Sequence, residues 1–335
     1  MASKVILDVD PGIDDAIAIV TALRSHKIEL IGIATVYGNV TPQIGLLNTL
    51  KVLESMNRTD IPVILGAQKP LIKDLLPKTI VKRKEKSHGK YGLGNLYPCQ
   101  SNINESLKKE ISKENRRSKI INYISFVEFV NEIIKYSRDG DISIISTGPL
   151  TNIAQAILYK PEFIPKINQI SIMGGAYGLG SKIRGNITNY AEFNFYCDPD
   201  AARVVLRSPS LNSKIKVVGL DVTQHPSCEL NREFVKTVRH NLSLKKSSLG
   251  KLILSLLDFK LSHNSVFYLH DVLAVLIHEK PSHFFFRRGN IEITLGGKSR
   301  GHSEFVDDKT SGNVQVTKAL RKGNELTSFL YSRLA

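Results

Sequence analysis

Four carboxylates lie within eight residues near the start of the chain: Asp8, Asp10, Asp14 and Asp15. Four negative charges this close repel one another unless a cation or a proton lies among them. Carboxylate oxygens are also the ligands that hard divalent cations prefer. The cluster follows the apolar run at 5–7 and precedes a helix-like stretch. It therefore predicts a metal-dependent site at the carboxyl end of a first strand.

Other interpretations explain less of this cluster. Asp14 and Asp15 alone could be first-turn residues that favour the helix dipole. An EF-hand loop begun at Asp8 fails, because its fifth position is Gly12 and its twelfth is Ile19. A phosphatase of the haloacid dehalogenase type also begins with Asp-x-Asp after a strand, but it expects Thr or Val at the position of Gly12. That phosphatase stays as an alternative, with Asp8 as its nucleophile.

The elements that would position these carboxylates alternate along the chain. Short runs rich in Ile and Val predict strands at 4–10, 29–36, 61–67, 141–147, 167–174 and 214–221, and helices are predicted at 16–23, 42–57, 125–136, 152–158 and 199–207. This alternation predicts an α/β fold of Rossmann-like type, with a mostly parallel central sheet flanked by helices. We expect helical additions over 232–279, an edge strand at 290–295 and a peripheral tail after Ser299, all within one domain spanning 1–335.

The composition is ordinary for a soluble globular protein, with 42% hydrophobic and 23% charged residues. No apolar run approaches the roughly 20 residues that span a bilayer. The three cysteines are few and widely spaced, so neither a disulfide framework nor a zinc cluster is indicated. We therefore expect a cytoplasmic protein with no membrane partner.

The net charge of +15 is concentrated at 69–90, 108–119 and 232–251. Part of it falls in an irregular basic insertion at about 68–120, which we expect to be a loop. A nucleic-acid role would need aromatic interleaving or a groove-reading motif, and the sequence offers neither. Specific nucleic-acid binding is not expected, although a non-catalytic protein that binds nucleosides or nucleic acid is the third interpretation.

Polar residues follow most of the predicted strands. Ligands of open α/β sheets bind just beyond the carboxyl ends of the strands. The residues at these positions are Asp10, Asn39, His88, Thr147, Met173 and Asp221. Several independent polar groups at one sheet edge predict a common site.

These motifs together resemble the inosine-uridine-preferring nucleoside hydrolase family over about residues 4–300. The resemblance rests on DVDPGIDDA at 8–16, VYGN at 36–39, TGPLTN at 147–152, MGG at 173–175, GNIT at 185–188, AEFN at 191–194 and HD at 270–271. It implies calcium-dependent (Ca²⁺) hydrolysis of the N-glycosidic bond of ribonucleosides, in purine and pyrimidine salvage. It also implies a homodimer or homotetramer.

The resemblance assigns the reacting groups. Asp10, Asp15, the backbone carbonyl of Thr147 and Asp271 would hold calcium. Asp10 would also act as the general base toward a metal-acidified water. His270 would face the departing base and donate a proton to it.

The resemblance also assigns the substrate contacts. Asp14 and Asn39 would bind the 2′-hydroxyl side of the ribose, and Met173 and Phe193 would pack against the sugar. The 3′- and 5′-hydroxyls would be bound by Asn186, Glu192 and Asn194. His88 would lie in the loop that contacts the base, where Tyr91 replaces the family's usual acidic residue. Trp is absent, which disfavours the purine-specific branch of the family and favours a purine-and-pyrimidine or pyrimidine-leaning enzyme.

Overall fold

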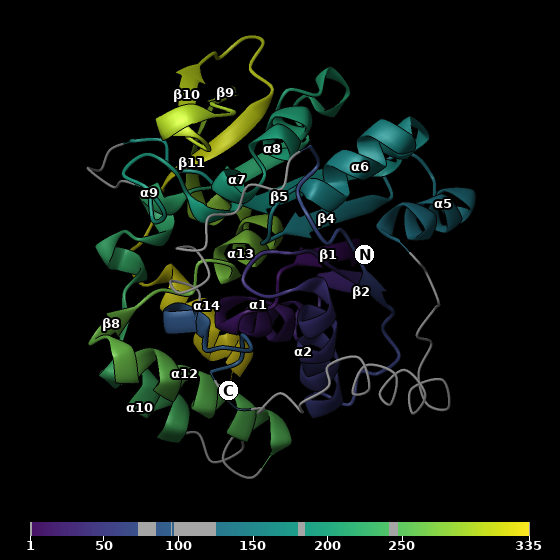
Figure 1. Ribbon diagram of the computed structural model, residues 1–335. Coiled ribbons are helices and arrows are strands. Elements are labelled where there is room, and N and C mark those ends of the chain that lie inside the picture. Colours follow the sequence, from purple (N-terminus) through teal and green to yellow (C-terminus); the bar gives the residue numbers. More distant parts are fainter. Residues whose placement is uncertain are drawn as a thin grey trace.

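The computed structural model describes residues 2–72, 85–94, 96, 125–179, 185–240 and 247–334 (Figure 1). Most of the insertion predicted at 68–120 lies outside these described residues, so its interpretation as a loop stays a prediction. Within the described ranges, no helix is both long and apolar enough to cross a bilayer.

The described residues form a mixed central sheet in the order β10-β9-β11-β6-β5-β4-β1-β2-β3. The parallel part consists of β1 (Ser3–Val9), β2 (Ile28–Thr35), β3 (Val63–Leu65), β4 (Ile142–Ser146), β5 (Ile167–Met173) and β6 (Ile215–Val218). All six strands were predicted. The last is shorter than expected, because the chain turns at Gly219 into the short helix α9 (Leu220–Thr223).

The end of the chain completes this sheet, so the prediction of a peripheral tail after Ser299 is wrong. β9 (Phe284–Ile293) pairs antiparallel with both β10 (Ser303–Asp307) and β11 (Val314–Leu320), and β11 also pairs in parallel with β6. The edge strand predicted at 290–295 is therefore part of an interior strand. Val314 and Val316 are fully buried, and this alternate burial is the signature of a strand in a sheet.

Helices cover both faces of the sheet (Figure 1). One apolar core lies under α1 (Ile13–Leu23), α2 (Pro42–Ser55), α12 (Ser248–His263), α13 (Val272–Glu279) and α14 (Glu325–Leu334). The other lies under α5 (Phe126–Tyr136), α6 (Thr151–Tyr159) and α8 (Pro199–Leu206). The predicted Rossmann-like α/β fold is confirmed, and the C-terminal third adds strands as well as the expected helices.

Smaller elements lie around this frame. The short helix α7 (Phe193–Cys197) precedes α8, and α10 (Arg232–His240) packs against α12. A two-stranded sheet joins β7 (Leu230–Asn231) to β8 (Val266–Phe267). The described parts of 232–279 are mainly helical, as predicted.

His278, near the end of α13, should make the stability of the fold depend on pH. Its Nδ1 lies 3.2 Å from Nε2 of Gln169, whose Oε1 accepts a hydrogen bond from Lys216. Burial and then the charge of Lys216 lower the pKa of His278 to about 4. In the unfolded chain a histidine has a pKa of roughly 6.5. At this residue the unfolded state therefore binds more protons between these values, and we expect the contribution of His278 to stability to fall by about 2 kcal/mol as the pH drops through this window.

Urea unfolding at pH 7 and at pH 4.5 measures this loss. The variant His278→Gln keeps a polar side chain but cannot take up the proton, so its stability should fall less over the same interval. An equal fall in both proteins would show that other groups cause the acid sensitivity.

Candidate active site

A cavity of about 250 Å³ opens where β1, β4 and β5 end. Every predicted substrate-binding residue lines it, together with Thr147, His270 and Asp271. Asp10 and Asp15 are fully buried beside this lining. The structure thus brings the predicted residues from distant parts of the chain to one place.

Asp15 is held by hydrogen bonds on both carboxylate oxygens. Oδ1 accepts from the hydroxyl of Thr147 at 2.7 Å and from the amide of Asp10 at 3.3 Å. Oδ2 accepts from the amide of Gly12 at 2.9 Å and from the side chain of Asn39 at 3.4 Å. Burial raises the pKa of Asp15, whereas the hydrogen bonds from Thr147 and Gly12 favour its anion. The carboxylate is therefore fixed at the start of α1.

Asp10 is fixed by the loop that follows β2. Its Oδ2 accepts a hydrogen bond from the amide of Asn39 at 2.6 Å. A side chain at Gly38 would place its Cβ only 1.9 Å from this oxygen. The sequence Tyr-Gly-Asn therefore needs its glycine so that the backbone can approach the carboxylate.

Asp271 brings a further carboxylate to this group from the start of α13. Burial, followed by the charges of Asp15, Asp14 and Asp10, raises its pKa well above the usual range. Among the residues that the structure describes, no three His, Cys, Asp or Glu side chains already stand as a metal site. The donor types nevertheless fit a hard divalent cation, because carboxylates and the carbonyl of Thr147 offer only oxygen ligands.

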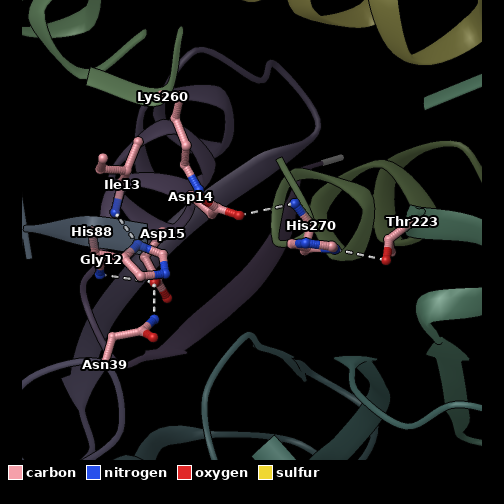
Figure 2. Close-up of polar contacts among 9 residues, drawn as sticks. All are labelled: Gly12, Ile13, Asp14, Asp15, Asn39, His88, Thr223, Lys260 and His270. Atoms are coloured by element: carbon pink, nitrogen blue, oxygen red, sulfur yellow. Dashed lines mark hydrogen bonds and ion pairs between the residues drawn. The ribbon is translucent and has the colours of Figure 1, made fainter. Parts of the chain in front are cut away.

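Asp14 lies in an ion pair that the sequence did not predict. Nζ of Lys260, from α12, lies 2.5 Å from Oδ1 of Asp14, and Oδ2 accepts a hydrogen bond from the amide of His270 at 3.2 Å (Figure 2). Burial alone would raise the pKa of Asp14, but the charges of Lys260, His88 and His270 lower it to about 2. Asp14 is therefore an anion within a group of nitrogen-bearing side chains.

His270 is oriented by a hydroxyl group. Its Nδ1 lies 2.8 Å from Oγ1 of Thr223, at the end of α9 (Figure 2). Burial lowers the pKa of His270 to about 4, against the opposing charge of Asp14. The ring is thus neutral near pH 7, and if Thr223 donates to Nδ1, the ring proton is on Nε2.

His88 packs against the first turn of α1. Its Nδ1 accepts a hydrogen bond from the amide of Ile13 at 3.1 Å. A Cβ at Gly12 would lie 2.4 Å from the same ring nitrogen. Gly12 therefore gives the imidazole room to reach the cavity.

Amides and a carboxylate form another part of the cavity wall. Nδ2 of Asn194 donates to the carbonyl of Thr147 at 2.7 Å. Glu192 caps α7, with Oε1 accepting from the amide of Asn194 at 2.8 Å and Oε2 accepting from the amide of Gly175 at 3.0 Å. Oδ1 of Asn186 is buried, and no described residue satisfies it. This wall offers donors and acceptors of the kind that sugar hydroxyls use.

Besides Asp10 and Asp15, two further predicted residues, Asp8 and Asp221, are absent from the cavity lining. Oδ1 of Asp8 accepts from Nδ2 of Asn152 at 2.7 Å, and burial raises the pKa of Asp8 to about 7. Asp8 therefore lies where it can orient the residues around it, and its position does not favour a role as nucleophile. Asp221 was expected to end a strand, but it lies in α9 and accepts hydrogen bonds from the amides of Tyr177 and Leu179.

Four lining residues were not predicted: Ser87, Ile187, Gln224 and Lys260. Ser87 and Ile187 adjoin predicted residues, and Gln224 directly follows α9. Lys260 has a subtler signal. It continues the apolar stripe of α12 formed by Leu249, Leu252, Ile253 and Leu256, so a charge falls on the buried face of that helix.

A family model described as inosine-uridine preferring nucleoside hydrolase matches residues 5–325. The chain belongs to this family. This match confirms the predicted family and its class of enzyme.

Known relatives of this nucleoside hydrolase act on different bases. It is 33% identical over 306 residues to a probable uridine nucleosidase 2 of Arabidopsis thaliana, covering 89% of this chain and 84% of the relative. It is 40% identical over 224 residues to the pyrimidine-specific ribonucleoside hydrolase RihA of Escherichia coli, covering 67% and 62% of the two chains. A solved structure of a purine-preferring ribonucleoside hydrolase from Gardnerella vaginalis matches with a TM-score of 0.82 at 28% identity, covering 99% and 98%.

Proposed function

We propose that this protein hydrolyses the N-glycosidic bond of ribonucleosides to ribose and free base, with purine and pyrimidine substrates of the inosine and uridine type. The observation that carries the proposal is the shared cavity. The polar residues that follow separate strands line one space, and the carboxylate cluster lies at its side. Nucleoside salvage in the cytoplasm, by a homodimer or homotetramer, is proposed on the family resemblance alone.

Asp10, Asp15, the carbonyl of Thr147 and Asp271 are the proposed ligands of a calcium ion. When bound, such an ion would neutralise the clustered charges and acidify a water molecule. Calcium is the proposed metal because these ligands are all oxygens and its shell of six to eight ligands leaves room for substrate hydroxyls.

Asp10 is the proposed general base. It is fully buried, and the amide of Asn39 holds its Oδ2 at 2.6 Å. A carboxylate fixed in this way can accept the proton of the attacking water at its other oxygen. Water then supplies the hydroxyl group that bonds to C1′ of the sugar.

His270 is the proposed proton donor to the departing base. It lines the cavity, and a hydrogen bond donated by Thr223 to Nδ1 would leave the ring proton on Nε2 for the base. Because the imidazole is neutral near pH 7, it would act through a hydrogen bond that strengthens as the base gains negative charge.

The ribose would be bound at its hydroxyls. Asn186, Glu192 and Asn194 are the proposed partners of the 3′- and 5′-hydroxyls, with Asp14 and Asn39 on the 2′ side. Met173 and Phe193 would pack against the sugar ring, and His88 would approach the base. A site that hydrogen-bonds a hydroxyl group rejects analogues that lack it, so a deoxyribonucleoside should be a poor substrate.

Reducing-sugar release from inosine, uridine, adenosine and cytidine in the presence of calcium tests this function. We expect ribose from uridine and inosine, and at least about 10²-fold slower release from deoxyuridine. Absence of ribose from all four nucleosides, with folded protein and calcium present, would refute the proposal. Phosphate esters would then be the next substrates to assay.

A further inference from the structure

Lys260 presents a positive charge to the cavity, and the proposed chemistry does not yet use it. Its side chain is only 12% exposed, and its Nζ lies 2.5 Å from Oδ1 of Asp14 (Figure 2). An ammonium group carries three N–H donors, so pairing with one carboxylate leaves donors for a ligand in the cavity. Because the side chain is mostly buried, its charge is screened less by solvent than a charge on the surface.

The chemistry of the lining tells which half of a nucleoside Lys260 would meet. Asn186, Glu192 and Asn194 offer the amide and carboxylate groups that suit sugar hydroxyls. His88, Lys260 and His270 line the cavity near Asp14 instead: Lys260 is ion-paired with Asp14, the amide of His270 donates to it, and His88 accepts a hydrogen bond from the neighbouring amide of Ile13. The 3′ and 5′ side of the ribose would therefore face the amides. Its 2′-hydroxyl would meet Asp14, so the base, which is attached to the neighbouring C1′, would face the nitrogen-bearing side chains near Asp14.

Breaking the glycosidic bond puts negative charge on the base. The electron pair of the C1′–N bond stays on the ring nitrogen, the water hydroxyl bonds to C1′, and the water proton passes to Asp10. In uracil or hypoxanthine the charge spreads onto a ring carbonyl oxygen until the base takes up a proton. A fixed cation that meets this developing charge lowers the barrier, as donors in an oxyanion hole do.

We propose that Lys260 stabilises the departing base and thereby selects nucleosides whose base bears a ring carbonyl. The ion pair with Asp14 holds the ammonium group in place, while its remaining donors contact the carbonyl oxygen of the base. This inference rests on the proposed nucleoside hydrolysis and adds a group that determines its substrate class.

The variant Lys260→Met tests the role, because it keeps an unbranched side chain only one heavy atom shorter and removes the charge. The calcium-loaded enzyme is assayed with uridine and with p-nitrophenyl β-ribofuranoside, whose phenolate departs without assistance. We expect kcat/KM for uridine to fall about 10²- to 10³-fold, and that for the p-nitrophenyl riboside to fall less than about fivefold, because only the first needs leaving-group stabilisation. Adenosine, whose base has no carbonyl, should lose less than uridine.

Lys251→Met, on the exposed face of the same helix, is the matched control and should leave both rates unchanged. Equal losses on both substrates would mean that Lys260 only positions Asp14, and would overturn the inference. If Lys260→Met does not fold, Lys260→Gln gives the same ratio of rates. Failure of the wild-type enzyme to cleave either riboside would instead remove the proposed function, and this inference with it.

Discussion

Replacing Asp10 with asparagine is expected to reduce ribose release about 10³-fold or more, because a positioned general base contributes roughly 10²- to 10⁴-fold and the same carboxylate is a proposed metal ligand. Asparagine retains a side-chain oxygen that can accept the 2.6 Å hydrogen bond from the amide of Asn39. The loop after β2 should therefore keep its place. Initial rates of reducing-sugar release from uridine, with circular dichroism to confirm folding, measure the effect.

Asp8→Asn is the matched control for this variant. Asp8 is also fully buried, but its carboxylate accepts hydrogen bonds from Asn152 and Ser146, and it is not a proposed metal ligand or base. Loss of an orienting group of this kind costs about 10- to 100-fold. A phosphatase that uses Asp8 as its nucleophile predicts the opposite order, with Asp8→Asn inactive toward p-nitrophenyl phosphate. A larger loss of ribose release in Asp8→Asn than in Asp10→Asn would contradict the assigned roles.

Removal of divalent cations is expected to stop ribose release, and added calcium should restore it. The reason is that Asp10, Asp15 and Asp271 are buried together. Burial and then the charges of Asp15, Asp14 and Asp10 raise the pKa of Asp271 well above its usual range. A cation that binds only the folded state also stabilises it, by about 2.7 kcal/mol at 100 times its Kd. Thermal melting with EGTA and then with calcium should therefore show an upward shift in Tm.

The melting experiment distinguishes a lost metal site from a lost catalytic group. Asp271→Asn removes the negative charge of one proposed ligand, so its Tm should respond less to calcium than that of the wild type. Magnesium demands a tighter octahedral shell and should restore less activity than calcium. If neither the Tm nor the rate changed on chelation and calcium addition, the proposed metal site would be wrong.

The parallel part of the sheet could be predicted because its signal is local. Buried parallel strands read as short runs of Ile and Val, and the rule that ligands bind beyond their carboxyl ends gathered Asp10, Asn39 and Thr147 without any tertiary information. The lining of the cavity by Asn186 and Glu192 could not be derived in that way. Those residues follow β5 in a loop, and only the family resemblance pointed to them.

The sequence predictions were wrong or incomplete where the structure depends on contacts between distant parts of the chain. β10 contains Glu304 and Asp307 and reads as polar, yet pairing with β9 makes it a strand. Lys260 could not be placed in the cavity from sequence, because nothing local shows that α12 turns this side toward Asp14. β6 also ends earlier than predicted, because the chain turns at Gly219. A Cβ there would lie 2.6 Å from the ring of Tyr177, and this contact with a distant residue could not be predicted from the sequence.

The place of β11 between β6 and β9 has a consequence for biosynthesis. β6 and β9 have no direct pairing, so the sheet stays divided until residues 314–320 are available. Until then β6 and β9 each present a row of unpaired backbone N–H and C=O groups, which can recruit strands of other chains. A nascent or truncated chain that ends before Val314 would thus contain every residue of the candidate site and still be prone to aggregation. Solubility, rather than chemistry, would be the first property lost from this end of the protein.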